Sequence, residues 1–460
     1  MMFEDIRRVA SALEADIAFG AIVPAVRPDE IRDYLASRYT FSNALPLDDV
    51  IADVAGMMRR WHVQVTHPRY FGLFNPSVTL PSVIADTLTA MHNPQLATWR
   101  TSPAANEIER HTLAWLAGQF GLPASTIAHF TTGGAEANLS AVVVALARRF
   151  PQWSDGGLRS LPASPAIYLT GDAHGSFGKI ARVTGLGCDA LRMVSVDADR
   201  RLDVADLARR VDRDRRNGFA PLMVIGTAGT TAAGVVDPLA DIARFCRSEG
   251  LWFHADAAWG GAAALSPRLR VHLDGIANAD SVTCDAHKWF SVPMGAGMFF
   301  CRHPEAVRDA FRAHTGYMPQ PTAGAIDDPY ATSLQWSRRF IGLKLFVALA
   351  QRGGGGYVET IEHQARMGDL LRDSLARAGW TIVNRTPLPL VCFTRSGLDV
   401  GRFIADLCER QIAWMSEVRL GDSPPVVRAC VTSLRTRKED IDYVVREMTR
   451  LALRDSEVQV

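Results

Sequence analysis

The sequence has no stretch of about 18 uncharged apolar residues, the length that a membrane-spanning helix needs, so it predicts no such helix. Its first twenty residues place acidic side chains inside their apolar stretch, and we therefore expect no secretory signal peptide. An excess of charge of one sign is also missing, because 50 Lys and Arg against 49 Asp and Glu leave a net charge of +1. Without a basic field, neither nucleic acid nor an anionic membrane is expected as a partner.

The cysteines lack the close spacing that disulfide frameworks and structural zinc sites need. Seven is an odd number, and no two of these residues form a C-x-x-C pair. They are Cys188, Cys246, Cys284, Cys301, Cys392, Cys408 and Cys430. We therefore expect no disulfide framework and a reducing compartment, for which the cytoplasm fits best.

The 460 residues are 48% hydrophobic and 22% charged, a composition that can fold around a sizeable core. Between about residues 70 and 350, short apolar runs alternate with amphipathic helical patterns. The runs lie at 127–131, 166–170, 191–196, 222–227, 251–255, 280–284 and 297–301. Because most of them are continuous, they are typical of parallel strands covered by helices on both faces. The prediction is an α/β fold with a large, mostly parallel, doubly wound sheet.

The segments on either side of this region have different patterns. Residues 1–70 consist of helical pieces broken by VPAVRP and FSNALPLDD, with enough apolar content to pack on something larger. A run of four glycines at 353–356 interrupts the pattern, and helix is mixed with short strands after it. We predict an N-terminal helical arm at 1–70, a large domain at 71–350 and a small α+β domain at 351–460.

A glycine turn, Gly133-Gly134-Ala135, lies between a predicted strand and a predicted helix. Unpaired backbone N–H groups and the helix dipole would point at one spot there, as in an anion site. The turn lacks the Lys-[Ser/Thr] of a P-loop and the full G-x-G-x-x-G spacing, so ATP and dinucleotides have little support. A glycine turn chosen only for tight packing is the alternative interpretation.

Two further strand ends carry charged residues. The run at 251–255 delivers Asp256 among small and apolar residues, where a carboxylate needs a cationic partner because burying it alone is costly. The segment SVTCDAHKWF ends another strand with His287 and Lys288. Lysine is rare at the end of a core strand, although a salt bridge would also explain it.

Together the three strand ends match the needs of pyridoxal phosphate. This cofactor has a phosphate for a helix N-terminus, a ring nitrogen for an acid and an aldehyde for a lysine. The motifs TTGGAEAN, HADAAWGG and DAHKW resemble those of the pyridoxal phosphate-dependent group II amino-acid decarboxylases, which include the aromatic-L-amino-acid and glutamate decarboxylases. Similar segments follow in the family's order: HPRYFGLFNP, TSPAANEIE, GDAHGSFGKIARVTGLG, GTAGTTAAGVVDPL and LQWSRRFIGLKLF.

The resemblance covers residues 60 to 350 well and the two ends loosely. It implies the fold type I of pyridoxal phosphate enzymes, a homodimer with shared active sites, and a small-molecule amino acid as substrate. The reaction that it implies is decarboxylation of an L-amino acid to the amine and carbon dioxide, through an external aldimine and a quinonoid. An aldehyde synthase, in which oxygen intercepts the carbanion, is the alternative on the same fold.

The resemblance also implies roles for single residues. Lys288 matches the lysine that forms the Schiff base, and Asp256 the acid that pairs with the ring nitrogen. His174 matches the histidine that stacks on the ring, on the face opposite Ala258. A surface histidine at a helix start is the plain alternative for His174.

Other positions match residues around the phosphate and the ring. Gly134 and Ala135 match the residues whose backbone N–H groups hold the phosphate, and His287 matches the histidine beside the lysine. Thr231 matches a residue that hydrogen-bonds near the ring, although a turn hydroxyl would look the same. Asp285 departs from the asparagine of some members, and its charge would repel phosphate unless it is paired or turned away, so we leave it out of the predicted site.

The acid that returns a proton to the substrate is, by resemblance, a tyrosine on a mobile loop that reaches across a dimer interface. The segment MPQPTAGAIDDPYATSLQ is rich in proline, glycine and small residues, and Tyr330 in it matches best. Tyr317 is the second candidate, and a tyrosine that only anchors the loop is the alternative. The resemblance implies that aldehyde synthesis often follows loss of the loop tyrosine or of the ring-stacking histidine. Because candidates for both, Tyr330 and His174, are present, decarboxylation is favoured over aldehyde synthesis.

Four residues match the substrate pocket of the family: Leu73, Phe74, Thr98 and Trp99. Members specific for aromatic substrates often carry further rings at the positions of Leu73 and Ala97. Their absence weakens an aromatic assignment without supplying another.

Two other classes of protein compete with this interpretation. A metal-dependent hydrolase could use His254, Asp256, Asp285 and His287 as ligands, but Lys288 beside them would crowd a divalent ion, and no metal is predicted. A binding or scaffold protein gives no reason for charged groups at separate strand ends.

Overall fold

The computed structural model describes residues 20–75, 77–313 and 327–458, together with the single positions 4, 7 and 11. Its largest element is a seven-stranded sheet in the order β1-β7-β6-β5-β4-β2-β3. The strands are β1 (Ile127–Thr131), β2 (Pro165–Thr170), β3 (Leu191–Val194), β4 (Ala220–Thr227), β5 (Trp252–Asp256), β6 (Ser281–Asp285) and β7 (Gly297–Cys301). Six of these strands point in the same direction, and β7, between β1 and β6, runs opposite to them. The predicted α/β fold with a mostly parallel sheet is confirmed.

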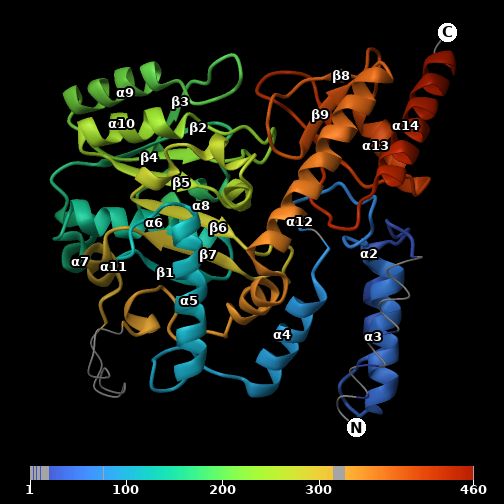
Figure 1. Cartoon of the computed structure of the whole chain (residues 1–460), viewed down its shortest axis with the longest axis horizontal. Helices are drawn as coiled ribbons and strands as arrows, with labels where there is room; N and C mark the ends of the chain where they lie inside the picture. The colour runs from blue at the N-terminus through green and yellow to red at the C-terminus, as the bar shows by residue number, and fades with distance from the viewer. Residues whose placement is uncertain are drawn as a thin grey trace.

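Helices cover both faces of this sheet (Figure 1). They are α5 (Pro103–Gln119), α6 (Gly134–Arg149), α7 (Trp153–Gly156), α8 (Ser176–Val183), α9 (Val204–Arg216), α10 (Leu239–Glu249) and α11 (Pro304–Phe311). Successive side chains of a strand point to opposite faces, so Met223 and Ile225 pack with α6 and α8, whereas Val224 packs with α9 and α10. Two buried faces explain why the strands are continuous apolar runs.

The parallel strands end at one edge of the sheet. In the register of the sheet, Thr227 at the end of β4 lies beside Asp256 at the end of β5, and Asp256 lies beside Thr283 of β6. In open α/β sheets, ligands bind beyond the carboxyl ends of the strands. This edge is therefore where the charged residues of the sequence come together.

A second, four-stranded antiparallel sheet has the order β10-β11-β9-β8. Its strands are β8 (Thr381–Ile382), β9 (Leu390–Thr394), β10 (Ser416–Val418) and β11 (Val426–Cys430), packed with α13 (Val400–Glu409) and α14 (Lys438–Val458). The long α12 (Leu343–Arg377) passes from the large sheet to this smaller one (Figure 1). The four glycines do not end α12; only Gly353 leaves helical geometry, with φ 67°, and the helix resumes after this kink.

The N-terminal helices α2 (Pro28–Arg38) and α3 (Leu47–Trp61) have no buried residue. They stand away from the seven-stranded sheet, beyond α4 (Leu80–His92) (Figure 1). Large apolar side chains are exposed on and between them, among them Phe41 at 92%, Leu47 at 72% and Met58 at 53%. Exposed apolar side chains gathered in this way are typical of an interaction surface.

Among the residues that the structure describes, no helix is both long and apolar enough to span a membrane.

A buried ion pair joins α5 to the segment that precedes α12. The guanidinium of Arg338 lies 2.6 Å from Glu109, and both side chains are at most 5% exposed. The other carboxylate oxygen of Glu109 accepts a hydrogen bond from the backbone N–H of Gly342 at 2.8 Å. Removing one partner of such a pair leaves an uncompensated buried charge.

We expect Arg338→Met to lower the free energy of unfolding by about 3–5 kcal/mol, because the Glu109 carboxylate would stay buried without its cation. The double variant Glu109→Gln/Arg338→Met should lose less, since the glutamine side chain carries no charge. Arg339→Met is the matched control: its ion pair with Asp86 is half-exposed and should be worth about 1 kcal/mol or less. Urea unfolding of the four proteins measures this, and equal losses for Arg338→Met and Arg339→Met would contradict it.

Candidate active site

Lys288 lies in a tight turn directly after β6. Its backbone N–H donates to the carbonyl of Asp285 at 3.2 Å, and its Nζ lies 3.0 Å from Asp285 Oδ2. The same Nζ lies 5.5 Å from the centre of the Phe74 ring. The turn thus presents the lysine amine at the carboxyl edge of the sheet, between a carboxylate and an aromatic face.

Asp256 ends the neighbouring strand β5 and is 3% exposed. Its Oδ2 accepts a hydrogen bond from Asn138 Nδ2 at 2.9 Å, and its Oδ1 accepts one from the backbone N–H of Ala258 at 3.1 Å. Within the described ranges, no Lys, Arg or His nitrogen lies within 4.0 Å of this carboxylate. The cationic partner that the sequence predicts for the Asp256 carboxylate is therefore not among the described residues, and a bound ligand could provide it.

Asn138 organises the polar groups under Asp256. Its Oδ1 faces His254 Nε2 at 3.1 Å, and His254 Nδ1 faces the hydroxyl of Ser281 at 2.8 Å. Burial lowers the pKa of His254 to about 4, so the ring is neutral at pH 7 and donates from Nε2 to Asn138. Because both ring nitrogens are engaged, His254 has none to offer a metal, as the hydrolase alternative required.

His174 lies on the turn between β2 and α8 and is exposed. Its Nδ1 accepts a hydrogen bond from the backbone N–H of Ser176 at 3.2 Å and lies 2.9 Å from the Ser176 hydroxyl. The neutral ring therefore carries its proton on Nε2. The Ser176 hydroxyl is in turn 3.5 Å from Asn138 Nδ2, which connects His174 to the group that holds Asp256.

The glycine turn lies against the end of β6. A Cβ added to Gly134 would meet Asp285 Oδ2 at 2.8 Å and the Cβ of Ala258 at 3.2 Å, so only glycine fits there without a shift. Gly134 begins α6, and Ala135 follows in its first turn, where backbone N–H groups have no partner inside the helix. The turn has the open donors of an anion site, but the Asp285 carboxylate lies beside it.

His287 is buried between this turn and Lys288. Its Nδ1 accepts a hydrogen bond from the backbone N–H of Ala296 at 3.1 Å, which places the proton of the neutral ring on Nε2. Burial lowers the pKa of His287, while the carboxylate of Asp285 opposes this shift. Its Nε2 lies 3.8 Å from Asp285 Oδ2, so the N–H is directed at the region beside the glycine turn.

A buried guanidinium that was not predicted from the sequence also lies over Phe74. Arg428 is 3% exposed, and its Cζ lies 4.8 Å from the centre of the Phe74 ring. Its Nε donates to the carbonyl of Thr231 at 2.9 Å, whereas its Nη2 has no hydrogen-bond partner in the described part of the chain. Thr231 itself is exposed, and its predicted contact near the ring stays a prediction.

The remaining predicted residues form a second cluster. Thr98 is buried, and the backbone N–H of Trp99 donates to Asp328 at 2.7 Å. The N–H of Tyr330 donates to the carbonyl of Ala97 at 3.1 Å. None of the contacts found among the described residues joins this cluster to Lys288.

Two further predictions concern Leu73 and Tyr317. Leu73 is 56% exposed, unlike its neighbour Phe74, which packs at 4.6 Å on the ring of Trp259. Tyr317 lies outside the described residues.

The missed residues left weak signals in the sequence. Asn138 is a single amide within the apolar helix pattern ANLSAVVVALA, and Arg428 interrupts the apolar run VVRAC. A buried polar side chain needs a partner, so each of these positions could have been marked as part of a polar network.

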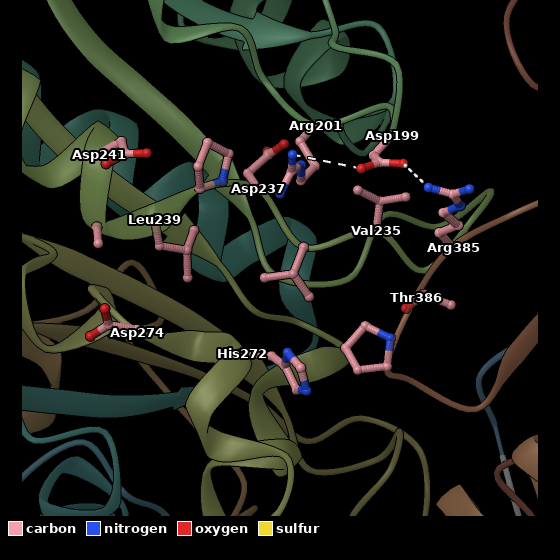
Figure 2. A pocket seen from close by; sticks show the side chains of 14 residues that line it. Asp199, Arg201, Val235, Asp237, Leu239, Asp241, His272, Asp274, Arg385 and Thr386 are labelled. Atoms are coloured by element: carbon pink, nitrogen blue, oxygen red, sulfur yellow. Dashed lines mark hydrogen bonds and ion pairs between the residues drawn. The ribbon is translucent and has the colours of Figure 1, made fainter.

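A separate hollow of about 450 Å³ lies away from these groups, between the segment that leads into α10 and residues 385–387 (Figure 2). One of its acids is paired inside it, since Asp199 lies between Arg201 and Arg385, at 3.7 and 3.4 Å. It contains none of the predicted catalytic residues.

The cluster around Lys288 fits pyridoxal phosphate at three points. Lys288 supplies an amine for the aldehyde, and Asp256 is a buried carboxylate that lacks the cation which a protonated ring nitrogen would provide. The turn at Gly134 supplies N–H groups for a phosphate. Asp285 is the one group that opposes the phosphate.

Comparisons with known proteins agree with this fit. The pyridoxal-dependent decarboxylase conserved domain matches residues 28–396. Aromatic-L-amino-acid decarboxylase of Bacillus atrophaeus is 27% identical over 401 residues, which cover 84% of this chain and 82% of that protein. L-2,4-diaminobutyrate decarboxylase of Rhizobium meliloti is 31% identical over 323 residues, 68% of this chain and 63% of that protein. The crystal structure of mouse CSAD in apo form has a TM-score of 0.90 at 24% identity and covers 98% of both chains.

The matched domain spans most of the chain, and the similarity of fold extends over nearly all of it. The predicted family, its cofactor pyridoxal phosphate and the fold type are thereby confirmed. The chain belongs to the pyridoxal-dependent decarboxylases, which are carboxy-lyases acting on amino acids.

Proposed function

We propose that Lys288 and Asp256 are the centre of an enzyme that converts one L-amino acid to its amine and carbon dioxide. The observation that carries this proposal is the pairing of a strand-end amine with a buried, cation-free carboxylate on the adjacent strand. When bound, the cofactor accepts the electron pair that carbon dioxide leaves on the α-carbon of the substrate. Asp256 makes this possible because its negative charge keeps the ring nitrogen protonated.

The other residues bind and orient. Gly134 and Ala135 donate backbone N–H groups to the phosphate, and His287 directs its Nε2–H toward the same region. His174 would cover one face of the ring and Ala258 the other, and Thr231 would provide a hydroxyl near the ring. Asn138 is a positioning residue, since it holds Asp256 through its amide.

Tyr330 is proposed as the acid that returns a proton to the α-carbon. Its cluster with Thr98 and Trp99 makes no contact with Lys288 within the described part of one chain, which supports a role in the site of a partner subunit. Leu73 and Phe74 line the substrate side of the lysine. We further propose that residues 1–70 form the dimer arm of a homodimer, 71–350 the cofactor domain and 351–460 the small domain, because α2 and α3 leave an apolar surface uncovered.

The substrate is an amino acid, and the names of the relatives do not agree on the chemical class of its side chain. The two compared enzymes are named for an aromatic and a diamino substrate, at similar identity to this chain. The seven cysteines are free thiols, most of them buried, which supports a reducing compartment such as the cytoplasm.

The attachment of the cofactor can be tested by chemical labelling. The protein loaded with pyridoxal phosphate should turn yellow and bleach with borohydride, which converts the link to Lys288 into a stable amine. Peptide mass mapping should then find the pyridoxyl group on Lys288. A label on Lys344, whose amine is buried and donates to the carbonyl of Met294, would refute the assignment.

We expect Asp256→Asn to keep the fold but to lower the rate of carbon dioxide release by about two to three powers of ten. An amide cannot hold the ring nitrogen protonated, and a charge-assisted interaction of this kind is worth about 2–4 kcal/mol. The rate is measured with saturating cofactor, and bound cofactor is determined in the same samples. A rate within threefold of the parent would show that another group protonates the ring.

Mixed dimers test whether Tyr330 serves the site of the partner. In air, Tyr330→Phe alone should still release carbon dioxide but give less amine and more aldehyde, because protonation follows the loss of carbon dioxide and oxygen can oxidise the unprotonated carbanion instead. Lys288→Ala alone should release no carbon dioxide and form neither amine nor aldehyde. In a dimer of one subunit of each variant, the intact Lys288 and the intact Tyr330 meet in one site if the tyrosine crosses the interface.

The ratio of amine to carbon dioxide should therefore rise toward the parental value in the mixed dimer. A ratio that stays at the Tyr330→Phe value would place the tyrosine in its own subunit's site or assign the proton to another group. A chain that remains monomeric at 50.3 kDa would exclude sharing altogether.

A further inference from the structure

Asp285 is a buried charge that the roles above do not use. Its side chain is 2% exposed, its Oδ1 has no hydrogen-bond partner in the described residues, and its backbone N–H donates to the carbonyl of Ala258 at 2.9 Å. The backbone at both ends of the residue is therefore fixed by the sheet and by the turn. The side chain is therefore anchored at a buried position beside the glycine turn.

The surroundings of Asp285 define where its charge acts. Its Oδ2 would lie 2.8 Å from a Cβ on Gly134, in the turn whose N–H groups are the anion donors of the site. The ion pairs of this carboxylate, within the part of the chain that the structure describes, are with Lys288 Nζ at 3.0 Å and with His287 Nε2 at 3.8 Å. Since His287 Nδ1 accepts a hydrogen bond from the backbone N–H of Ala296, the ring carries no second proton, and Lys288 is the one full positive charge among these described neighbours.

A phosphate held by this turn would lie beside the carboxylate of Asp285. Two anions a few ångströms apart repel, and the repulsion is strong in a buried site where water does not screen it. The Lys288 amine offsets part of the carboxylate charge, but the same amine is required for the aldehyde. The phosphate therefore meets a net negative neighbour on one side of its binding turn.

We propose that Asp285 is a specificity-determining residue that weakens the hold of this site on the phosphate of pyridoxal phosphate. This inference rests on the proposed binding turn at Gly134 and goes beyond the assignment of the cofactor. The site then binds phosphate esters less tightly than its N–H donors alone would allow. As a consequence, the fraction of the enzyme that carries the cofactor depends on the cofactor concentration.

The test separates the phosphate from the aldehyde. 4′-Deoxypyridoxine 5′-phosphate carries the ring and the phosphate but no aldehyde, so its binding does not involve a covalent bond to Lys288. 4′-Deoxypyridoxine is the same probe without phosphate. The measured quantity is the ratio of the two dissociation constants, obtained by fluorescence titration of the full-length protein after removal of bound cofactor.

Asp285→Asn should tighten binding of the phosphorylated probe by about tenfold or more, the change that about 1.4 kcal/mol of relieved repulsion gives. Binding of the unphosphorylated probe should stay the same. Asp285→Ala should shift the ratio in the same direction, because it also removes the charge but offers no new donor. Asp214→Asn is the matched control, since Asp214 is also a buried, ion-paired aspartate but lies on α9, where it binds Arg192 and Tyr168.

Each outcome decides the proposal. A ratio unchanged in both Asp285 variants would overturn it, and so would a gain in Asp285→Asn alone, which would show a new hydrogen bond from the amide. If Asp214→Asn changed the ratio of the two dissociation constants equally, the effect would come from the overall charge of the protein and the proposal would fail. If neither probe binds the parent protein, the assignment of the site itself fails, which is distinguishable from a failure of the role of Asp285.

Discussion

The active site depends on the cost of burying the Asp256 carboxylate. The strand β5 carries this residue into the core, where an unpaired charge is unfavourable by several kcal/mol or more. The protein meets the cost in part, with one amide from Asn138 and one backbone N–H from Ala258. In the proposed function a protonated ring nitrogen would supply the missing cation, and this would link folding to cofactor binding through one side chain. The neutral His254 under Asn138 adds a hydrogen bond without adding a competing charge.

Much of the fold was predictable from the sequence because local signals agreed with the tertiary structure. The seven apolar runs correspond to the seven strands of the large sheet. The direction of β7 was not predictable, since a buried antiparallel strand between two helical layers has the same apolar composition as a parallel one. The glycine run at 353–356 does mark an interruption, but only Gly353 leaves helical geometry and α12 resumes after this kink, which the local pattern alone did not predict.

The site was predictable where a motif combines residues that lie close in sequence, as in the segment from Asp285 to Lys288. It was not predictable where partners come from distant segments. The sequence carries no sign that Asn138 meets Asp256, 118 positions away, or that Arg428 lies over Phe74. The sequence also did not predict that Tyr330 and Lys288 belong to two separate clusters, because this separation depends on the tertiary structure. Such a division is expected when an active site is completed by a second subunit.

The measurement that tests this account most directly is the stoichiometry of the reaction itself. Purified protein loaded with pyridoxal phosphate is offered each protein L-amino acid and L-2,4-diaminobutyrate in deuterated water, and carbon dioxide, amine and deuterium content are determined. The account predicts one preferred L-substrate that gives carbon dioxide and amine in equal amounts, with one solvent deuterium on the former α-carbon and no reaction in Lys288→Ala. Release of carbon dioxide that persists undiminished in Lys288→Ala would contradict it.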